Sequence, residues 1–207
     1  LDHWPGVLII TLYTLTYFFM DDLSKYFVHR CMHRWQFLWA FHKVHHSAET
    51  MTPITVYRVH PVESILYGLR GSIVIGAVIG IFAYCFGIDN FSLATLLGVN
   101  LFSFIFNIAG ANLRHSHIEI AYWPWLEKIF ISPAQHQLHH SIENKHFNKN
   151  YGAMLAIWDW LFGSLHFSET GKSIRFGLRP NEASATNIIS IYLRPFVEIS
   201  NIVKYFY

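Results

Sequence analysis

The sequence predicts an all-α integral membrane protein in which three or more transmembrane helices carry a histidine-rich helical cap. Hydrophobic residues make up 53% of the chain and charged residues 14%, whereas about 25% of the residues in a soluble domain are charged. The charges avoid three apolar stretches, and thirteen of the fourteen histidines lie in the two segments between and after these stretches. With 207 residues, the chain is expected to form a single domain, 1–207.

The first predicted transmembrane helix covers residues 5–20. This stretch is close to the short limit for a bilayer, which takes about 20 residues to cross. A signal peptide is the alternative, but no basic region precedes the stretch and no small-residue cleavage site follows it. We therefore interpret it as a membrane span.

Two further spans are predicted in residues 71–110, where Asp89 is the only charged residue. Forty apolar residues are too many for one crossing and fit two. The turn-forming cluster Gly87-Ile88-Asp89-Asn90 divides them into helices at 71–87 and 91–110. The sequence thus predicts a transmembrane hairpin.

The hairpin brings the two histidine-bearing segments, 21–70 and 111–166, to the same face of the membrane. All fifteen Lys and Arg residues lie before or after the hairpin, so the positive-inside rule places this face in the cytoplasm. The compact length, without a fused electron-transfer module, favours a multi-pass protein of a bacterial inner membrane. The net charge of +2 and the absence of a basic cluster argue against a nucleic-acid partner.

Histidine spacing is the main functional signal. Residues three or four apart share a face of a helix, and three clusters have this spacing, two of them as H-x-x-H-H. They contain His29 and His33; His42, His45 and His46; and His136, His139 and His140. Eight imidazoles at such spacing predict metal ligation.

The identity of the metal is less certain from the residues alone. The zinc-protease motif H-E-x-x-H is absent from the sequence, and eight or nine imidazoles are too many for one four-coordinate zinc ion. They suit two six-coordinate ions, although imidazole binds iron, zinc, copper and nickel alike. A membrane zinc hydrolase is therefore an alternative function. A metal transporter is a third, disfavoured because 71–110 contains no histidine.

These motifs, in this order, resemble the fatty acid hydroxylase and sterol desaturase superfamily of membrane oxygenases. The resemblance covers roughly residues 15–168. Supporting stretches are "RVHPVE" at 58–63, "NLRHSH" at 112–117, "ISPAQHQLHH" at 131–140, "HFNKNYG" at 146–152 and "WDWLFGSL" at 158–165.

The resemblance implies a non-haem diiron centre that uses O2 to hydroxylate or desaturate a C–H bond of a lipid or sterol-like substrate. Zinc can take the place of iron in purified protein. The chain lacks a cytochrome b5 domain and a G-x-G-x-x-G motif, so electrons are expected from a separate ferredoxin-type or cytochrome b5-type donor with its reductase. The eight clustered histidines take the family's ligand positions. A ninth ligand is expected from His117, whose spacing fits better, with His115 as the alternative.

Other polar residues have structural alternatives. His60 and His146 remain open as ligands, although a structural role is favoured for both. Asp22 lies two helical turns before His29 and is expected to orient it through a hydrogen bond. Asp159, between two tryptophans, is expected to support a ligand histidine, because an unpaired buried carboxylate is unfavourable. Asn112 is assigned to the surroundings of the site, with helix capping as its alternative.

Overall fold

The computed structural model describes residues 4–87, 110–180, 182 and 187–204. Within these ranges the regular secondary structure is helical. The extended backbone there pairs only at two isolated bridges, Phe130 with Leu155 and Ser141 with Phe176. The all-α prediction is therefore confirmed for the described part of the chain.

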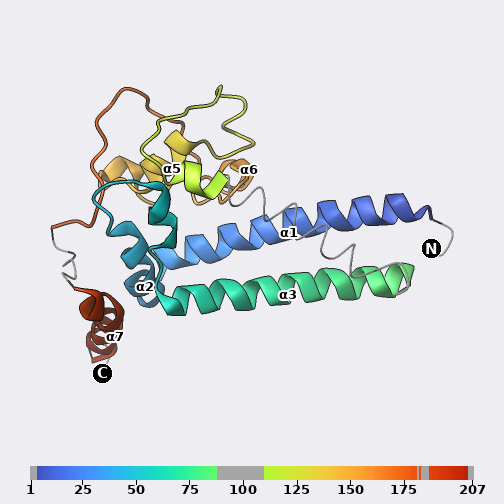
Figure 1. Ribbon diagram of the computed structural model, residues 1–207, viewed down its shortest axis with the longest axis horizontal. Coiled ribbons are helices and arrows are strands. Elements are labelled where there is room, and N and C mark those ends of the chain that lie inside the picture. Colours follow the sequence, from blue (N-terminus) through green and yellow to red (C-terminus); the bar gives the residue numbers. More distant parts are fainter. Residues whose placement is uncertain (1–3, 88–109, 181, 183–186, 205–207) are drawn as a thin grey trace.

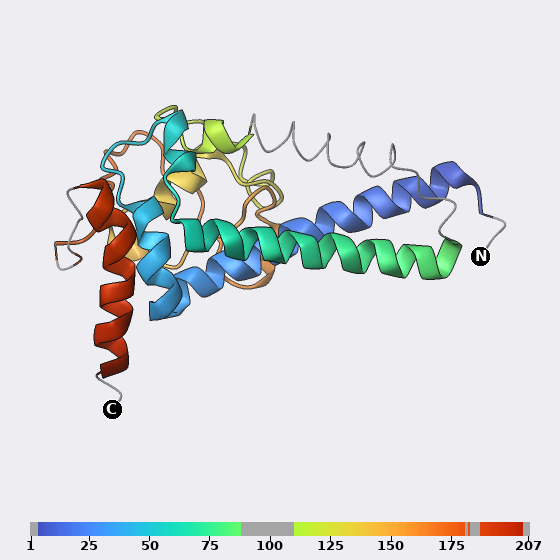
Figure 2. The ribbon, with the colours of Figure 1, turned by 60° about the horizontal axis from the view of Figure 1, so that its bottom comes forward.

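Two long antiparallel helices, α1 (Gly6–Arg34) and α3 (Pro61–Phe86), lie side by side (Figures 1 and 2). They contain 29 and 26 residues, or about 43 and 39 Å at 1.5 Å per residue, which exceeds the roughly 30 Å of a hydrocarbon core. Their apolar windows are only 28% and 11% buried. The core helix of a soluble protein would be mostly buried, so both helices are suited to contact lipid.

Apart from the end residues Pro5 and Gly87, the predicted spans 5–20 and 71–87 fall within α1 and α3, and both helices extend beyond them towards the histidines. The helix α3 ends before Gly87, whose φ of 83° suits a residue without a Cβ atom. The predicted third span, 91–110, and most of the predicted turn lie outside the described residues.

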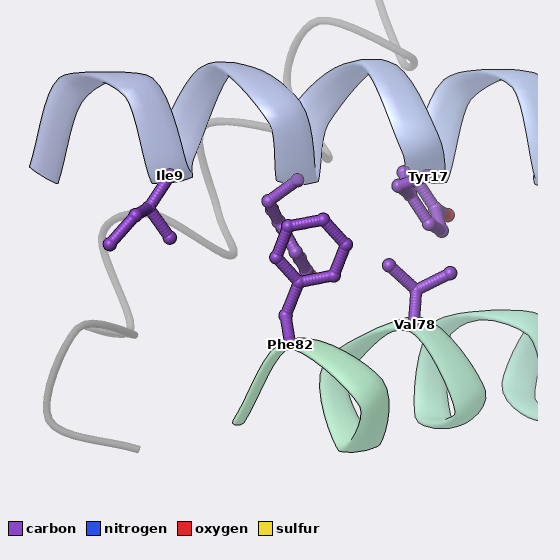
Figure 3. Close-up of a cluster of buried hydrophobic side chains, with 5 residues drawn as sticks. Ile9, Tyr17, Val78 and Phe82 are labelled. Atoms are coloured by element: carbon purple, nitrogen blue, oxygen red, sulfur yellow. The ribbon is translucent and has the colours of Figure 1, made fainter. Parts of the chain in front are cut away.

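Aromatic and aliphatic side chains hold α1 against α3. Figure 3 shows Ile9 and Tyr17 of α1 facing Val78 and Phe82 of α3. The rings of Tyr13 and Phe82 meet edge to face, with centroids 5.5 Å apart, a favourable geometry for aromatic pairs. The helix pair is therefore packed along the part that is farthest from the histidines.

Where α1 becomes polar, ion pairs replace this apolar contact. The carboxylate of Asp21 pairs with Arg70 of α3 at 2.8 Å and with Lys25 at 2.7 Å. The remainder of α1, which carries His29 and His33, continues into the cap. The long helices therefore fix the position of the first histidine pair.

The cap covers the C-terminal half of α1 (Figure 1). It contains the short helices α2 (Gln36–His46), η1 (Pro53–Tyr57), α5 (Pro133–His139), η3 (Asn144–His146) and α6 (Ile157–Leu161). The helix α7 (Ile188–Lys204) packs on α2 and runs across the direction of α1 and α3 (Figure 2). The two histidine-bearing segments are thus brought together in one cap.

Candidate metal centre

Nine histidines form two groups in the cap. In each group, one ring nitrogen from every member lies within 4.8 Å of those of the others. The first group contains His29, His33, His42, His46 and His139, and the second contains His45, His115, His136 and His140. The groups adjoin, because the rings of His46 and His140 stack with centroids 4.3 Å apart.

Helix periodicity explains how the members are distributed. Each pair of histidines four residues apart enters a single group: 29 with 33, 42 with 46, and 136 with 140. The remaining histidine of each H-x-x-H-H run, His45 or His139, enters the other group. At about 100° per residue, the side chain three residues after a histidine points about 60° to one side of it, and the side chain four residues after it points about 40° to the other side. Each run therefore contributes to both groups.

Local sequence fixes the helix that presents the last run. Ser132 is the N-cap of α5: its hydroxyl accepts a hydrogen bond from the Gln135 amide, and the Gln135 side chain accepts one from the Ser132 amide. Pro133 follows at the first helical position, where its missing N–H is not needed. This capping box places His136 in the first turn of α5.

The ring nitrogens approach one another closely. Five pairs of Nε2 atoms lie 2.9–3.3 Å apart: His29–His42, His29–His33, His45–His115, His115–His136 and His136–His140. Two nitrogens bound at a right angle to one ion, each at about 2.1 Å, would be about 3.0 Å apart. The spacing therefore fits ligands of a shared ion.

Hydrogen bonds on the opposite ring nitrogens fix the tautomers. The Nδ1–H groups of His29, His139 and His115 donate to the carbonyls of Tyr151, Lys149 and Ala111 at 2.7–2.8 Å. The Nδ1–H of His42 donates to Glu63 Oε1 at 2.9 Å. In a neutral imidazole the other nitrogen is then a lone-pair acceptor. Four Nε2 lone pairs therefore point into the groups.

Burial keeps several of the grouped imidazoles neutral. It lowers the pKa of His139 to about 3 and that of His115 to about 4. Burial, together with neighbouring imidazoles, also holds the pKa values of His45, His46 and His140 well below the usual range. Neutral imidazole is the form that binds metals.

Several buried nitrogens in the groups lack any partner. Nε2 of His46 and Nε2 of His139 have no hydrogen-bond partner within the described structure. Such buried groups are costly unless something satisfies them. Closely spaced lone pairs and orphaned nitrogens are together what two metal ions would satisfy, so the residues present fit a dinuclear centre.

The geometry distinguishes the two residues considered for the ninth position. His115 belongs to the second group, whereas the favoured His117 is exposed and lies in neither group. The helical turn 110–114 ends just before His115, so residue counting along a helix does not extend to His117. The Nδ1 hydrogen bond to Ala111 orients His115 towards His45 and His136.

The other two open histidines lie outside both groups. His60 is the N-cap of α3, where its Nδ1 accepts from the Val62 amide and its Nε2 faces the Tyr192 carbonyl. Both ring nitrogens are thus used in structure. His146 gathers instead with His166 and Glu169 in a separate group.

The expected role of Asp22 is wrong in detail. Its carboxylate accepts hydrogen bonds from the amides of Met154 and Leu155 and from the Trp158 indole, each at 2.9–3.0 Å. These three donors occupy the carboxylate, and a backbone carbonyl orients His29 instead. Asp22 therefore fixes the loop before α6 against α1.

In the described part of the chain, Asp159 does not contact a grouped histidine but binds the backbone next to one. Its carboxylate accepts from the amides of Tyr151 and Gly152 and from the Ser164 hydroxyl at 2.6–2.8 Å. It thereby holds the residue whose carbonyl orients His29. Burial raises the pKa of Asp159 to about 6. Asn112 lies on the helical turn that leads to His115, and its assignment to the surroundings of the site stays a prediction.

The sequence interpretation missed Glu63 and the carbonyls of Lys149 and Tyr151. Glu63 could have been suspected, since it is an acidic residue near the start of a helix within the noted stretch 58–63. The carbonyls carry no side-chain signal. The loop that carries these carbonyls does have a sequence signal, namely its two asparagines. Asn148 and Asn150 have φ values of 59° and 55°, and asparagine is enriched in this conformation.

Two cavities flank the nine histidines. One, of about 230 Å³, is lined by His29, His42, His45, His115 and His136. The other, of about 200 Å³, is lined by the remaining four, His33, His46, His139 and His140. No histidine of the two groups lines both cavities. The metal centre would therefore lie between two separate approaches.

Two long apolar helices that lead to closely spaced, buried imidazoles define a helical protein with a candidate histidine-bound metal centre. The chain belongs to the fatty acid hydroxylase family, whose sequence pattern matches residues 14–164. The match covers the two groups of histidines and the helices that carry them.

Curated relatives are similar over most of the chain. Ornithine lipid hydroxylase OlsE of Rhizobium tropici is 27% identical over 180 residues, which make up 86% of this chain and 47% of that protein. Alkylglycerol monooxygenase of Danio rerio is 28% identical over 159 residues, 76% of this chain and 31% of that protein. The chain thus spans about half the length of the first relative and a third of the second. No solved structure matches.

Proposed function

We propose that this chain is the catalytic part of an O2-dependent diiron oxidoreductase that hydroxylates a lipid. One observation carries the proposal. The Nε2 atoms of His29 and His42 are 3.1 Å apart, although both Nδ1 atoms face acceptors and so carry the protons. Two lone pairs at this distance repel one another unless a cation lies between them. In the second group, the hydrogen bond from His115 Nδ1 to Ala111 likewise leaves the His115 Nε2 lone pair facing Nε2 of His45 and of His136, at 3.0 and 2.9 Å.

The proposed ligands are the nine members of the two groups. Bound iron would supply the activation of O2 and the oxidation of an unactivated C–H bond. The chain's own residues hold the imidazoles in place: Glu63 orients His42, and the carbonyls of Tyr151 and Lys149 orient His29 and His139. Such outer hydrogen bonds raise the basicity of a ligand and fix its ring.

The lipid chain is proposed to enter the 230 Å³ cavity. Besides five histidines, its lining includes Val56, Val59, Tyr67 and Ala153, which suit methylene groups; the charged residues that also line it are Lys25, Glu63 and Arg114. Tyr67 belongs to α3, one of the two candidate membrane spans. A chain that enters from the bilayer would therefore reach the imidazoles without crossing the polar side of the cap.

The 200 Å³ cavity is proposed to face the aqueous side, towards a separate electron donor of the ferredoxin or cytochrome b5 type. Its lining includes Trp39, Arg179 and Glu182 in addition to four histidines. The Trp39 indole donates to Glu182 at 2.9 Å. A polar wall of this kind suits contact with water or a soluble protein more than contact with lipid.

The proposed setting is a bacterial inner membrane, crossed more than once, with the cap in the cytoplasm. The basic residues before and after 71–110 support this orientation by the positive-inside rule. The relatives are named as a hydroxylase, as a monooxygenase and, in a protein of Arabidopsis thaliana, as a putative sterol desaturase, so desaturation is the second candidate reaction.

The test combines metal analysis with product analysis. Detergent-purified wild type is expected to contain about two irons per chain, and His139→Ala less; His117→Ala, which removes an exposed histidine outside the groups, is the control. With O2 and an electron donor, membrane lipids should gain one oxygen atom. Zinc alone after expression with ample iron, with turnover that needs neither O2 nor reductant, would instead indicate a hydrolase.

A further inference from the structure

A third group of potential ligands lies outside the nine-histidine centre. Nitrogens of His146 and His166 and a carboxylate oxygen of Glu169 lie within 4.8 Å of one another. His146 comes from η3, and the other two residues follow α6 in the chain. The group therefore joins two loops that are separated by the stretch 147–165.

His146 lacks partners although it is buried. Its exposed fraction is 2%, and both ring nitrogens are without a hydrogen-bond partner in the described structure. Burial and the nearby Lys145 lower the pKa of His146, so its imidazole is neutral at pH 7. A buried neutral imidazole with both nitrogens unsatisfied is unfavourable unless a further group binds it.

The other two members already point their free atoms towards His146. The Nδ1–H of His166 donates to the Phe167 carbonyl at 2.9 Å, which leaves the Nε2 lone pair available. Glu169 Oε1 lies 3.6 Å from Nε2 of His166 and 3.7 Å from Nε2 of His146. These separations are too long for hydrogen bonds but are near those of ligands around one ion.

The surrounding contacts hold this arrangement. The backbone of His166 donates to Asn150 Oδ1 at 2.7 Å and accepts from Asn150 Nδ2 at 2.9 Å. Lys145 and Lys172 both bind Glu169 Oε2, and this leaves Oε1 free to face the histidines. The two ammonium groups also repel a cation, so binding is expected to be weaker than at a comparable site without lysines.

We propose that His146, His166 and Glu169 form a second metal site, for a divalent zinc-like ion, that is separate from the nine-histidine centre. Two imidazoles and one carboxylate are a known ligand set for zinc, with one position left for water. The ion would clamp η3 to the segment after α6. The loop that follows η3 supplies the carbonyls of Lys149 and Tyr151, so the proposed role of the ion is structural support of that loop.

The test uses iron-loaded, detergent-solubilised protein and zinc chloride as the probe. After removal of free metal, iron and zinc are counted separately in wild type, His166→Ala, Glu169→Gln and the control His117→Ala. We expect wild type and the control to retain one zinc ion per chain more than His166→Ala, and Glu169→Gln to bind zinc at least tenfold more weakly. Iron content should be the same in all four proteins.

Thermal unfolding gives a readout that does not depend on activity. Zinc should raise the midpoint of wild type and of the control but not that of His166→Ala, because an ion that binds only the folded state stabilises it. Equal zinc retention in wild type and His166→Ala would overturn the proposal, as would zinc uptake matched by iron loss, which would place zinc in the nine-histidine centre. Equal loss in His117→Ala would indicate adventitious surface binding and would also overturn it.

Discussion

Glu63 is the only carboxylate that hydrogen-bonds a ring nitrogen of the nine histidines within the described structure, and its replacement tests how the centre is held. Its Oε1 accepts from His42 Nδ1 at 2.9 Å, and the two side chains are 5% and 3% exposed. A buried hydrogen bond to a charged group contributes about 1.5–3 kcal/mol, roughly twice a neutral one. Glu63→Gln should therefore lose about half of this contribution, and Glu63→Ala all of it.

These energies convert to metal affinity, since 1.4 kcal/mol corresponds to tenfold. We expect iron retention to weaken about tenfold in Glu63→Gln and up to about a hundredfold in Glu63→Ala, within the range found for outer-sphere partners of metal ligands. The assay is iron per chain after dialysis against a graded chelator, with O2-dependent product as the second readout. Glu49→Gln, which changes an exposed carboxylate of the cap, is the matched control.

Folding is checked by circular dichroism and gel filtration, because Glu63 also lies in the first turn of α3, where a negative charge is favourable. If both Glu63 variants remain folded and retain iron as tightly as Glu49→Gln, the reasoning is refuted. The carboxylate would then not orient His42 in the loaded protein.

Three further predictions follow from the same contacts. His115→Ala should lower iron retention and product at least tenfold, whereas His117→Ala should match wild type in both measurements. The metal-free protein should lose thermal stability as the pH falls from about 6.5 to 4. In the unfolded state the imidazoles take up protons near pH 6.5, whereas in the folded state the pKa values of His115 and His139 are about 4 and 3. The unfolded state therefore binds protons first, and this shifts the equilibrium towards it. For Asp159, burial raises the folded pKa to about 6, so the folded state holds the extra proton and this contribution to stability falls as the pH rises from about 4 to 6. Asp159→Asn should remove this pH dependence from the denaturation midpoint. At pH 7 it should lower stability by about 1–3 kcal/mol, because the Asn amide has only one acceptor atom and its Nδ2 group would face the buried Gly152 N–H that Oδ2 accepts from in the wild type.

Periodicity and charge placement were sufficient to predict the helical fold and eight of the nine grouped histidines. Both signals are local in sequence: apolar stretches identified α1 and α3, and spacings of three and four identified the clusters. The ends of helices were harder to predict. Residues 21–34 continue α1 despite their charges, because Asp21 is neutralised by Arg70 and Lys25 and the apolar faces beyond them are buried by the cap.

The residues that orient the ligands depend on tertiary contacts that spacing does not encode. Asp22 has the right helical position to reach His29, but the loop before α6 supplies three better-placed donors. His115 directly follows the helical turn 110–114 and bonds the Ala111 carbonyl through both its amide and its Nδ1, whereas His117 lies two residues further on and is exposed. The carbonyls of Lys149 and Tyr151 are brought to the site by a loop with two asparagines at positive φ. For Asp22, and for the Tyr151 carbonyl that orients His29, the partners are more than a hundred residues apart in the sequence.

The repeated H-x-x-H-H spacing has a structural consequence in this fold. Each run gives its four-apart pair to one group and its middle histidine to the other: His45 joins the group of His136 and His140, and His139 joins the group of His42 and His46. Neither α2 nor α5 can therefore complete a group by itself. An ion bound in either group would connect the two helices. It would also help to position a histidine of the other group, because His45 and His46 are adjacent in the chain, as are His139 and His140. Because each H-x-x-H-H run contributes histidines to both groups, the two metal sites of the proposed centre form one structural unit.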